Sequence, residues 1–118
     1  MRELRRGDVV WVDFSPTRGR EQFGERPAVI VASNDYLDSV PDLAIALPVT
    51  TNDRGWPHHV RLTGARLQLR KAGWALTEQP RAVSRDRVSR SAGQIDSDCQ
   101  HEIDQWLRDF LRLHQQAR

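Results

Sequence analysis

The fold of this chain is decided by two short apolar runs, Pro27-Ala28-Val29-Ile30-Val31-Ala32-Ser33 and Leu43-Ala44-Ile45-Ala46-Leu47-Pro48-Val49. Neither run has the 3.6-residue spacing of an amphipathic helix, and both have the length and the aliphatic character of a strand. Strands that are apolar along their whole length are buried on both faces of a sheet. The two runs are therefore predicted to be central strands.

Shorter segments with strand composition lie on either side of these runs. Residues 8–14 mix β-branched and aromatic side chains, and residues 15–19 then break the pattern with turn-forming residues. Residues 59–62 and 74–77 are shorter pieces of the same kind. The sequence predicts about five short antiparallel strands.

Only the last part of the chain has a helical pattern. Its apolar side chains recur at i, i+3, i+4, i+7, i+8 and i+11, which predicts one stripe along a helix. The stripe consists of Ile103, Trp106, Leu107, Phe110, Leu111 and His114. Ser97 and Gln100 form a capping-box pattern at its start. The predicted fold class is therefore mainly β with a C-terminal helix, arranged as a small, partly open barrel in one domain of residues 1–118.

The amino-acid composition indicates in which cellular compartment the protein occurs. The 118 residues include one cysteine, Cys99, and the mean hydropathy is −0.66. One thiol forms no internal disulfide, no apolar run approaches about 18 residues, and no signal-peptide pattern follows the first residues. We expect a cytoplasmic protein without a membrane span.

The positive charge is concentrated in one third of the chain. Residues 54–90 contain nine basic residues against two acidic ones, a net +7, although the whole chain carries only +2. Arginine supplies 17 of the 18 basic residues, and its planar guanidinium suits bidentate recognition of phosphate. A coding bias toward arginine explains the large number of arginines as well as phosphate binding does. It explains less well why the positive charge is concentrated in residues 54–90.

Several familiar sites are missing from the sequence, which has no Walker or Rossmann glycine loop, no HExxH and no nucleophile elbow. The segment 17–26 is a candidate binding loop, although a solvated connection is its ordinary role. Arg26 ends this loop directly before an apolar strand, and Thr50 and Asn52 follow the other apolar strand. If the two strand ends are adjacent, these side chains form a phosphate site.

A second candidate region lies in residues 53–61, where Trp56 and two histidines accompany two arginines. This mixture suits base stacking and phosphate contact with single-stranded nucleic acid. In an extended segment His58 and His59 point to opposite faces, so we expect no metal site there. Gln79 and Arg81 add an amide and a guanidinium near the end of a later strand. Trp11 and Trp106 lie in patterned segments and are predicted to be core residues.

Several of these segments together resemble the MazF/PemK-type toxins of bacterial toxin-antitoxin pairs. The similar segments are Arg-Gly-Asp-Val-Val-Trp-Val-Asp-Phe at 6–14, Pro-Thr-Arg-Gly-Arg-Glu-Gln at 16–22, Arg-Pro-Ala-Val-Ile-Val at 26–31, Pro-Val-Thr-Thr-Asn at 48–52, Thr-Glu-Gln-Pro-Arg-Ala-Val at 77–83 and Arg-Asp-Arg-Val at 85–88. The resemblance runs in order from about residue 6 to residue 111.

The resemblance implies a homodimeric SH3-like barrel that cuts single-stranded RNA without a metal or other cofactor and is neutralised by a cognate antitoxin. It implies that DNA is contacted only through the antitoxin complex. The family's catalytic residues correspond to Arg26 and Thr50. Its RNA-binding positions correspond to Glu21, Gln22, Asn52 and residues 79–81, including Gln79 and Arg81, and we add Trp56 and His58 from their composition. The sequence departs from the family at Pro80 and at the two histidines.

Two alternatives stay open at this point. A gyrase-poisoning toxin of the same fold relies on a Trp-Gly-Ile terminus, whereas this chain ends in Gln115-Gln116-Ala117-Arg118. A non-catalytic RNA- or DNA-binding module would share the arginine block and the stacking residues.

Overall fold

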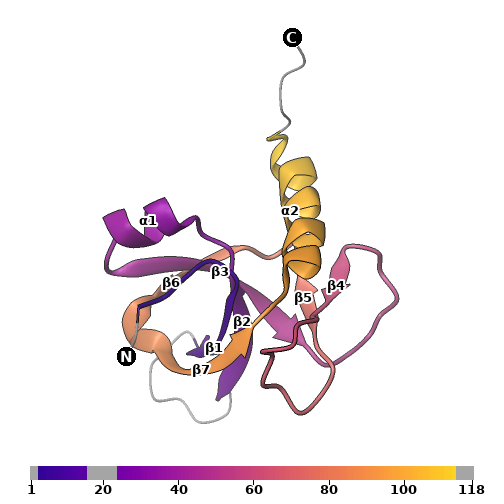
Figure 1. The fold of residues 1–118 in the computed structure, drawn as a ribbon, viewed down its shortest axis with the longest axis horizontal. Helices are drawn as coiled ribbons and strands as arrows, with labels where there is room; N and C mark the ends of the chain where they lie inside the picture. Colours follow the sequence, from indigo (N-terminus) through magenta and orange to yellow (C-terminus); the bar gives the residue numbers. More distant parts are fainter. Residues whose placement is uncertain (1–2, 16–23, 114–118) are drawn as a thin grey trace.

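The computed structural model describes residues 3–15 and 24–113, and Figure 1 shows the chain as a ribbon. Seven strands, two α-helices and one 3₁₀ turn follow one another along these residues. They are β1 (Asp8–Asp13), β2 (Glu25–Ile30), α1 (Asn34–Ser39), β3 (Leu43–Thr50), β4 (His59–Arg61), β5 (Trp74–Leu76), β6 (Arg81–Ser84), the 3₁₀ turn Arg85–Arg87, β7 (Val88–Gln94) and α2 (Ser97–Leu111).

All strands pair antiparallel in the order β4-β5-β3-β2-β1-β7, and β6 also pairs with β3. The long strand β3 has two partners along one edge. Its residues 43–46 pair with β6 and its residues 49–50 pair with β5. The mainly-β class with a C-terminal helix is confirmed, but the pairing of the described strands does not close into a ring, so the sheet is barrel-like only in a loose sense.

Alternate side chains of the central strands enter two different core clusters. Ala28 and Ile30 of β2 belong to one cluster, which includes Leu37 of α1. Val29, between them, belongs to the other cluster, which includes Ile103 of α2. Successive side chains of a strand point to opposite faces, and both faces of this sheet are covered. The continuous apolar runs that predict central strands have this physical origin.

Helix α2 covers the second cluster near β4 with its first turns. Ile103 is fully buried and Trp106 and Leu107 are half-buried, whereas Phe110 and Leu111 are 43% and 54% exposed. Figure 1 shows the reason, because the last turns of α2 extend beyond the sheet. His114, the last member of the predicted stripe, lies outside the described residues.

The start of α2 differs from the prediction. Asp96, not Ser97, is the N-cap, because its Oδ1 accepts a hydrogen bond from the Cys99 backbone N–H at 2.8 Å. The same oxygen also accepts from the Thr63 hydroxyl at 3.0 Å. The carboxylate thus ties the helix to the loop after β4 as well as capping it.

Three elements, α1, β6 and β7, are not evident from the sequence pattern, and Arg81, predicted near the end of the strand that starts at Trp74, instead begins β6. Helix α1 has only six residues, too few to show a period, and begins where the Ser33 hydroxyl accepts from the Tyr36 backbone N–H at 3.0 Å. Strand β7 is mostly polar because it pairs only with β1 and buries little besides Val88 and Ala92. Gly93 fits here with a φ of 92°, because an added Cβ would lie 2.0 Å from the Arg66 carbonyl oxygen.

Within the described ranges, neither helix is long and apolar enough to span a bilayer.

Candidate nucleic-acid interface

Arg26 and Thr50 lie at neighbouring strand ends. Strands β2 and β3 pair with Ala28 opposite Pro48, and the same antiparallel register continued by two residues brings Arg26 opposite Thr50. Arg26 lies two residues before Ala28 and Thr50 lies two residues after Pro48. Because side chains alternate between the two faces of a strand, both side chains point to the same face of the sheet. Arg26 is exposed and Thr50 is half-buried. The pairing of β2 with β3 ends at Ala28 and Pro48, two residues short of Arg26 and Thr50, so their adjacency stays a prediction that the register supports.

The local bonds of Thr50 leave its hydroxyl proton available. Its Oγ1 accepts a hydrogen bond from the Asn52 backbone N–H at 3.1 Å. A hydroxyl group that accepts one bond still has its own O–H to donate. The turn after β3 thus orients the threonine oxygen and leaves a donor for an anion, while the Asn52 side chain is exposed beside it.

Arg81 reaches the same end of the sheet from β6. Its guanidinium carbon lies 4.8 Å from the centre of the Phe14 ring, a cation–π contact. Phe14 follows β1 two residues after Val12, which is the register partner of Arg26. A hollow of about 230 Å³ beside it is lined by Phe14, Arg81 and Arg87 among others. Two guanidinium groups thus lie around one end of β1.

Trp56 forms an exposed aromatic surface in the loop before β4. Its side chain is 48% exposed, and the Arg54 guanidinium carbon lies 5.6 Å from the ring centre. The His58 ring is stacked on Trp56, with centroids 5.5 Å apart and an interplanar angle of 28°. An exposed ring beside an arginine suits base stacking with phosphate contact. The predicted residues Glu21 and Gln22 lie outside the described residues.

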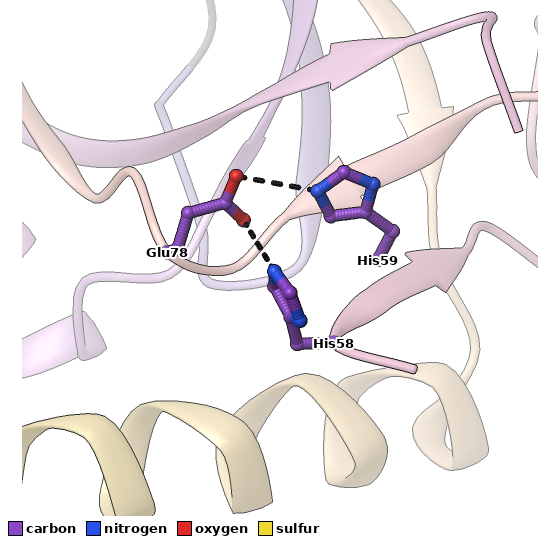
Figure 2. A group of neighbouring side chains, drawn as sticks. All are labelled: His58, His59 and Glu78. Atoms are coloured by element: carbon purple, nitrogen blue, oxygen red, sulfur yellow. Dashed lines mark hydrogen bonds and ion pairs between the residues drawn. The ribbon is translucent and has the colours of Figure 1, made fainter. Parts of the chain in front are cut away.

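Figure 2 shows that the imidazoles of His58 and His59 both point toward the carboxylate of Glu78. His59 Nε2 lies 3.2 Å from Glu78 Oε2, and His58 Nε2 lies 3.6 Å from Oε1. Gln79 adds a hydrogen bond from its side-chain amide to Oε2 at 3.4 Å. Glu78 therefore joins two of the predicted RNA-binding residues, His58 and Gln79.

The prediction that the two histidines point to opposite faces is wrong. It assumed an extended segment, but His58 lies in a turn closed by a hydrogen bond from the His59 N–H to the Trp56 carbonyl at 3.1 Å. Strand alternation begins only at His59, the first residue of β4. The two rings consequently lie 4.8 Å apart in a T-shaped arrangement.

Opposing influences act on the Glu78 carboxyl. Partial burial is the largest and works to raise its pKa. The hydrogen bond from its backbone, the hydrogen bond and charge of His59, and the hydrogen bond from Gln79 work the other way, and together they leave the pKa below its ordinary value. The group is thus a carboxylate at neutral pH.

A basic groove of about 650 Å³ lies on the other face of β1 and β2. Trp11, Arg70, Lys71 and Arg90 line it, and the Arg90 guanidinium carbon lies 4.5 Å from the centre of the Trp11 ring. Trp11 thus packs against the core, as predicted, and also lines this groove. The +7 block of residues 54–90 is the only sequence signal for the groove, because the basic residues that line it, Arg70, Lys71 and Arg90, form no motif.

Trp106 agrees with its predicted core role. It is half-buried, packs against the second core cluster, and lies with its ring centre 6.1 Å from that of His58.

The chain is similar to one family over most of its length. Residues 5–111 match the model of the PemK-like, MazF-like toxins of type II toxin-antitoxin systems. Endoribonuclease toxin MazF of Escherichia coli K12 is 37% identical over 78 residues, which are 66% of this chain and 66% of that protein.

Solved structures of similar proteins have the same fold. A crystal structure of MazF from Deinococcus radiodurans superposes with a TM-score of 0.77 at 28% identity, covering 95% of this chain and 99% of that one. A MazE-MazF structure from the same organism gives a TM-score of 0.78 at 28% identity, with 97% and 100% covered. The extent of the family match, together with this likeness in fold, means that the chain belongs to the PemK-like, MazF-like toxins of type II toxin-antitoxin systems.

Proposed function

We propose that this chain is the toxin of a toxin-antitoxin pair and acts as a sequence-specific endoribonuclease on single-stranded RNA. Membership of the toxin family is the observation that carries the proposal. The E. coli relative is named as an endoribonuclease. The neighbouring strand ends of Arg26 and Thr50 support it further, because they offer a cation and a hydroxyl group on one face of the sheet.

The chemistry needs few groups because RNA contains its own nucleophile. The 2′-OH attacks the adjacent phosphorus after losing its proton, and the 5′-oxygen of the next nucleotide leaves and gains one. The products are a 2′,3′-cyclic phosphate and a 5′-OH. Arg26 stabilises the additional negative charge on the phosphorane oxygens, and Thr50 donates its free O–H to the same phosphate.

Removal of the 2′-OH proton needs a group other than arginine, which stays protonated at neutral pH. Glu21 and the imidazole of His58 are the two candidates. The variants Glu21→Gln and His58→Gln distinguish them, because the loss of the base changes the pH profile of cleavage as well as its rate.

The remaining polar and aromatic residues bind the RNA strand. Trp56 stacks on a base, and Arg81 contacts phosphate. Asn52, His58 and Gln79 contact bases and sugars from the exposed turns, together with Glu21 and Gln22.

We further infer that the toxin is a cytoplasmic homodimer and that a cognate antitoxin neutralises it. The MazE-MazF structures from D. radiodurans are the supporting relatives. Like those complexes, this toxin would be covered by a MazE-like protein, and it would contact DNA only through that complex.

The test is incubation of the purified chain with a mixed RNA, followed by sequencing of the new ends. Cleavage that persists in excess EDTA and leaves 2′,3′-cyclic phosphate and 5′-OH ends supports the proposal. A substrate with one 2′-deoxyribose at the cut site should bind but stay intact. Binding of all RNA without any cutting would indicate a non-catalytic binding module, and inhibition of DNA gyrase would indicate the gyrase-poisoning alternative.

A further inference from the structure

We propose that His58, His59 and Glu78 form a binding site for one divalent transition-metal ion, with Zn²⁺ the best match to the donors. The ligands are the Nε2 atoms of both imidazoles and one carboxylate oxygen. The proposed cleavage chemistry uses no metal, and a His58 imidazole that binds the ion cannot also act as its base, which leaves Glu21 for that role.

The separations of the donor atoms agree with a tetrahedral ion. Bonds of about 2.0–2.1 Å place neighbouring ligand atoms about 3.3 Å apart. His59 Nε2 lies 3.2 Å from Glu78 Oε2 and His58 Nε2 lies 3.6 Å from Oε1, the other oxygen of the same carboxylate, and one ligand atom from each residue lies within 4.8 Å of the others. Small rotations of Glu78 and of the half-buried His58 therefore suffice to bring the three ligands around one ion.

The backbone arranges the three residues before any ion binds. His59 pairs with Leu76 across β4 and β5, and the turn after β5 brings Glu78 to the His59 side chain. The Thr77 hydroxyl donates to the His58 carbonyl at 2.5 Å and joins the two segments. Thr77 is fully buried, so this bond is protected from water.

The proton on His59 is free to change its position. The His59 side chain is only 2% exposed, and its Nδ1 is buried without a hydrogen-bond partner among the described side chains and backbone. No hydrogen-bond donor of the described residues points at Nδ1, so nothing requires Nδ1 to stay unprotonated. With the proton on Nδ1, the Nε2 lone pair is available to a metal, and the bond to the metal replaces the hydrogen bond between Nε2 and Glu78.

Aromatic rings surround the imidazole of His58. The ring centres of Trp56, Trp106 and Phe110 lie 5.5, 6.1 and 5.8 Å from that of His58. Such rings lower the local dielectric and limit the rotation of the ligand.

The donor types select the class of ion. Two imidazoles and one carboxylate suit Zn²⁺, Co²⁺, Ni²⁺ or Cu²⁺, whereas Mg²⁺ and Ca²⁺ prefer oxygen ligands alone. Three protein ligands leave a fourth tetrahedral position for water or an anion. The Trp56 ring centre lies 5.5 Å from that of His58 and 4.9 Å from that of His59, so a bound ion adds positive charge near the proposed stacking residue.

The experiment is a titration of the untagged, metal-free full chain with Co²⁺, followed by visible absorption, with Zn²⁺ then added as a competitor. We expect saturation at one ion per chain, the intense absorption of tetrahedral Co²⁺, its loss on addition of Zn²⁺, and a Zn²⁺-dependent rise in Tm. His58→Gln and Glu78→Gln should abolish these signals. The exposed His101→Gln on α2 is the matched control and should retain them.

The proposal is overturned if the wild-type chain gives no saturable signal, or if the signal persists in both His58→Gln and Glu78→Gln. His59→Gln is a third variant, and if it does not fold the other two still decide. Cleavage assays with EDTA separate this proposal from the proposed function. Loss of the Co²⁺ signal in Glu78→Gln with unchanged cleavage supports both, whereas wild-type cleavage that stops with EDTA and returns with Zn²⁺ supports the metal site and contradicts metal-independent chemistry.

Discussion

Arg26 combines an exposed charge with a restrained backbone. It pairs with Val12 in β1 and is followed by Pro27, whose ring limits the rotation of its own φ and restricts the residue before it to extended conformations. The strand then enters the core at Ala28. The backbone therefore adds little to the entropy lost when the guanidinium binds a phosphate, and the loss is confined to the side chain.

We expect Arg26→Ala to fold normally, because the side chain is exposed, and to lower the RNA cleavage rate by about 10²-fold or more, as when one preorganised donor of an oxyanion site is removed. Single-turnover cleavage measures the effect. Arg108→Ala, an exposed arginine on α2, is the control and should cleave at the wild-type rate. Activity of Arg26→Ala within about threefold of wild type would contradict the assignment.

Thr50 is expected to act on the same phosphate as Arg26. Thr50→Val keeps the shape and removes the hydroxyl, so cleavage should slow, and Thr50→Ser should restore most of the rate. The double variant with Arg26→Ala should lose less than the sum of the two single losses, measured as ratios of kcat/KM. Strictly additive losses would show that the two residues act on different steps or groups.

The pH dependence of stability tests whether burial raises the pKa of the Cys99 thiol. Burial is the largest influence on its thiol and raises the pKa, so the folded protein holds this proton more tightly than the unfolded chain does. Its contribution to stability is therefore complete below the ordinary thiol pKa and declines as pH rises above it. The difference in unfolding free energy between the wild type and Cys99→Ala, from urea titrations, should shrink between about pH 8 and about pH 10. A constant difference would contradict the raised pKa.

At the scale of elements, α2 is joined to the sheet at its first residue. The Asp96 carboxylate caps the helix and also accepts from Thr63 in the loop after β4. A cap with two partners fixes both the start of the helix and its position on the sheet.

Asp96→Ala should lower the free energy of unfolding by about 1–2 kcal/mol, the upper part of the range for lost N-caps, because the Thr63 bond is lost as well. Urea unfolding followed by circular dichroism measures the change. Asp98→Ala, an exposed acidic residue in the same first turn, is the control and should cost less. Equal losses would show that only the helix dipole matters.

At the scale of the whole molecule, basic groups surround the concave surfaces. Arg70, Lys71 and Arg90 line the larger groove, and Arg81 and Arg87 line the smaller hollow on the other face. A partner that covers these surfaces needs negative charge, which an acidic, partly disordered segment supplies as it folds on binding.

We expect expression of this chain alone to arrest growth, and co-expression of its antitoxin, a small protein with an acidic tail, to relieve the arrest. Growth curves with matched protein levels measure both effects. Arg26→Ala is the control, because it should accumulate without arrest. Normal growth of cells that contain intact, soluble wild-type chain would contradict the toxin proposal.

The sequence alone determined the central strands, the C-terminal helix and the candidate pair Arg26 and Thr50. The apolar runs and the helical stripe are local periodicities, and they report burial directly. Each residue of the pair directly adjoins one of those runs, so the positions of the strands also set the positions of Arg26 and Thr50, whereas their role in cleavage stays a prediction.

Only the tertiary structure shows which residues from distant segments of the chain lie next to one another. His58, His59 and Glu78 converge because a turn precedes β4 and because β4 pairs with β5, and neither fact is visible in the periodicity of residues 53–61. The basic groove, the double role of Asp96 and the edge strand β7 also depend on contacts between segments far apart in the chain. Local patterns determine which residues are buried, whereas the pairing of strands and the geometry of turns determine which polar groups meet.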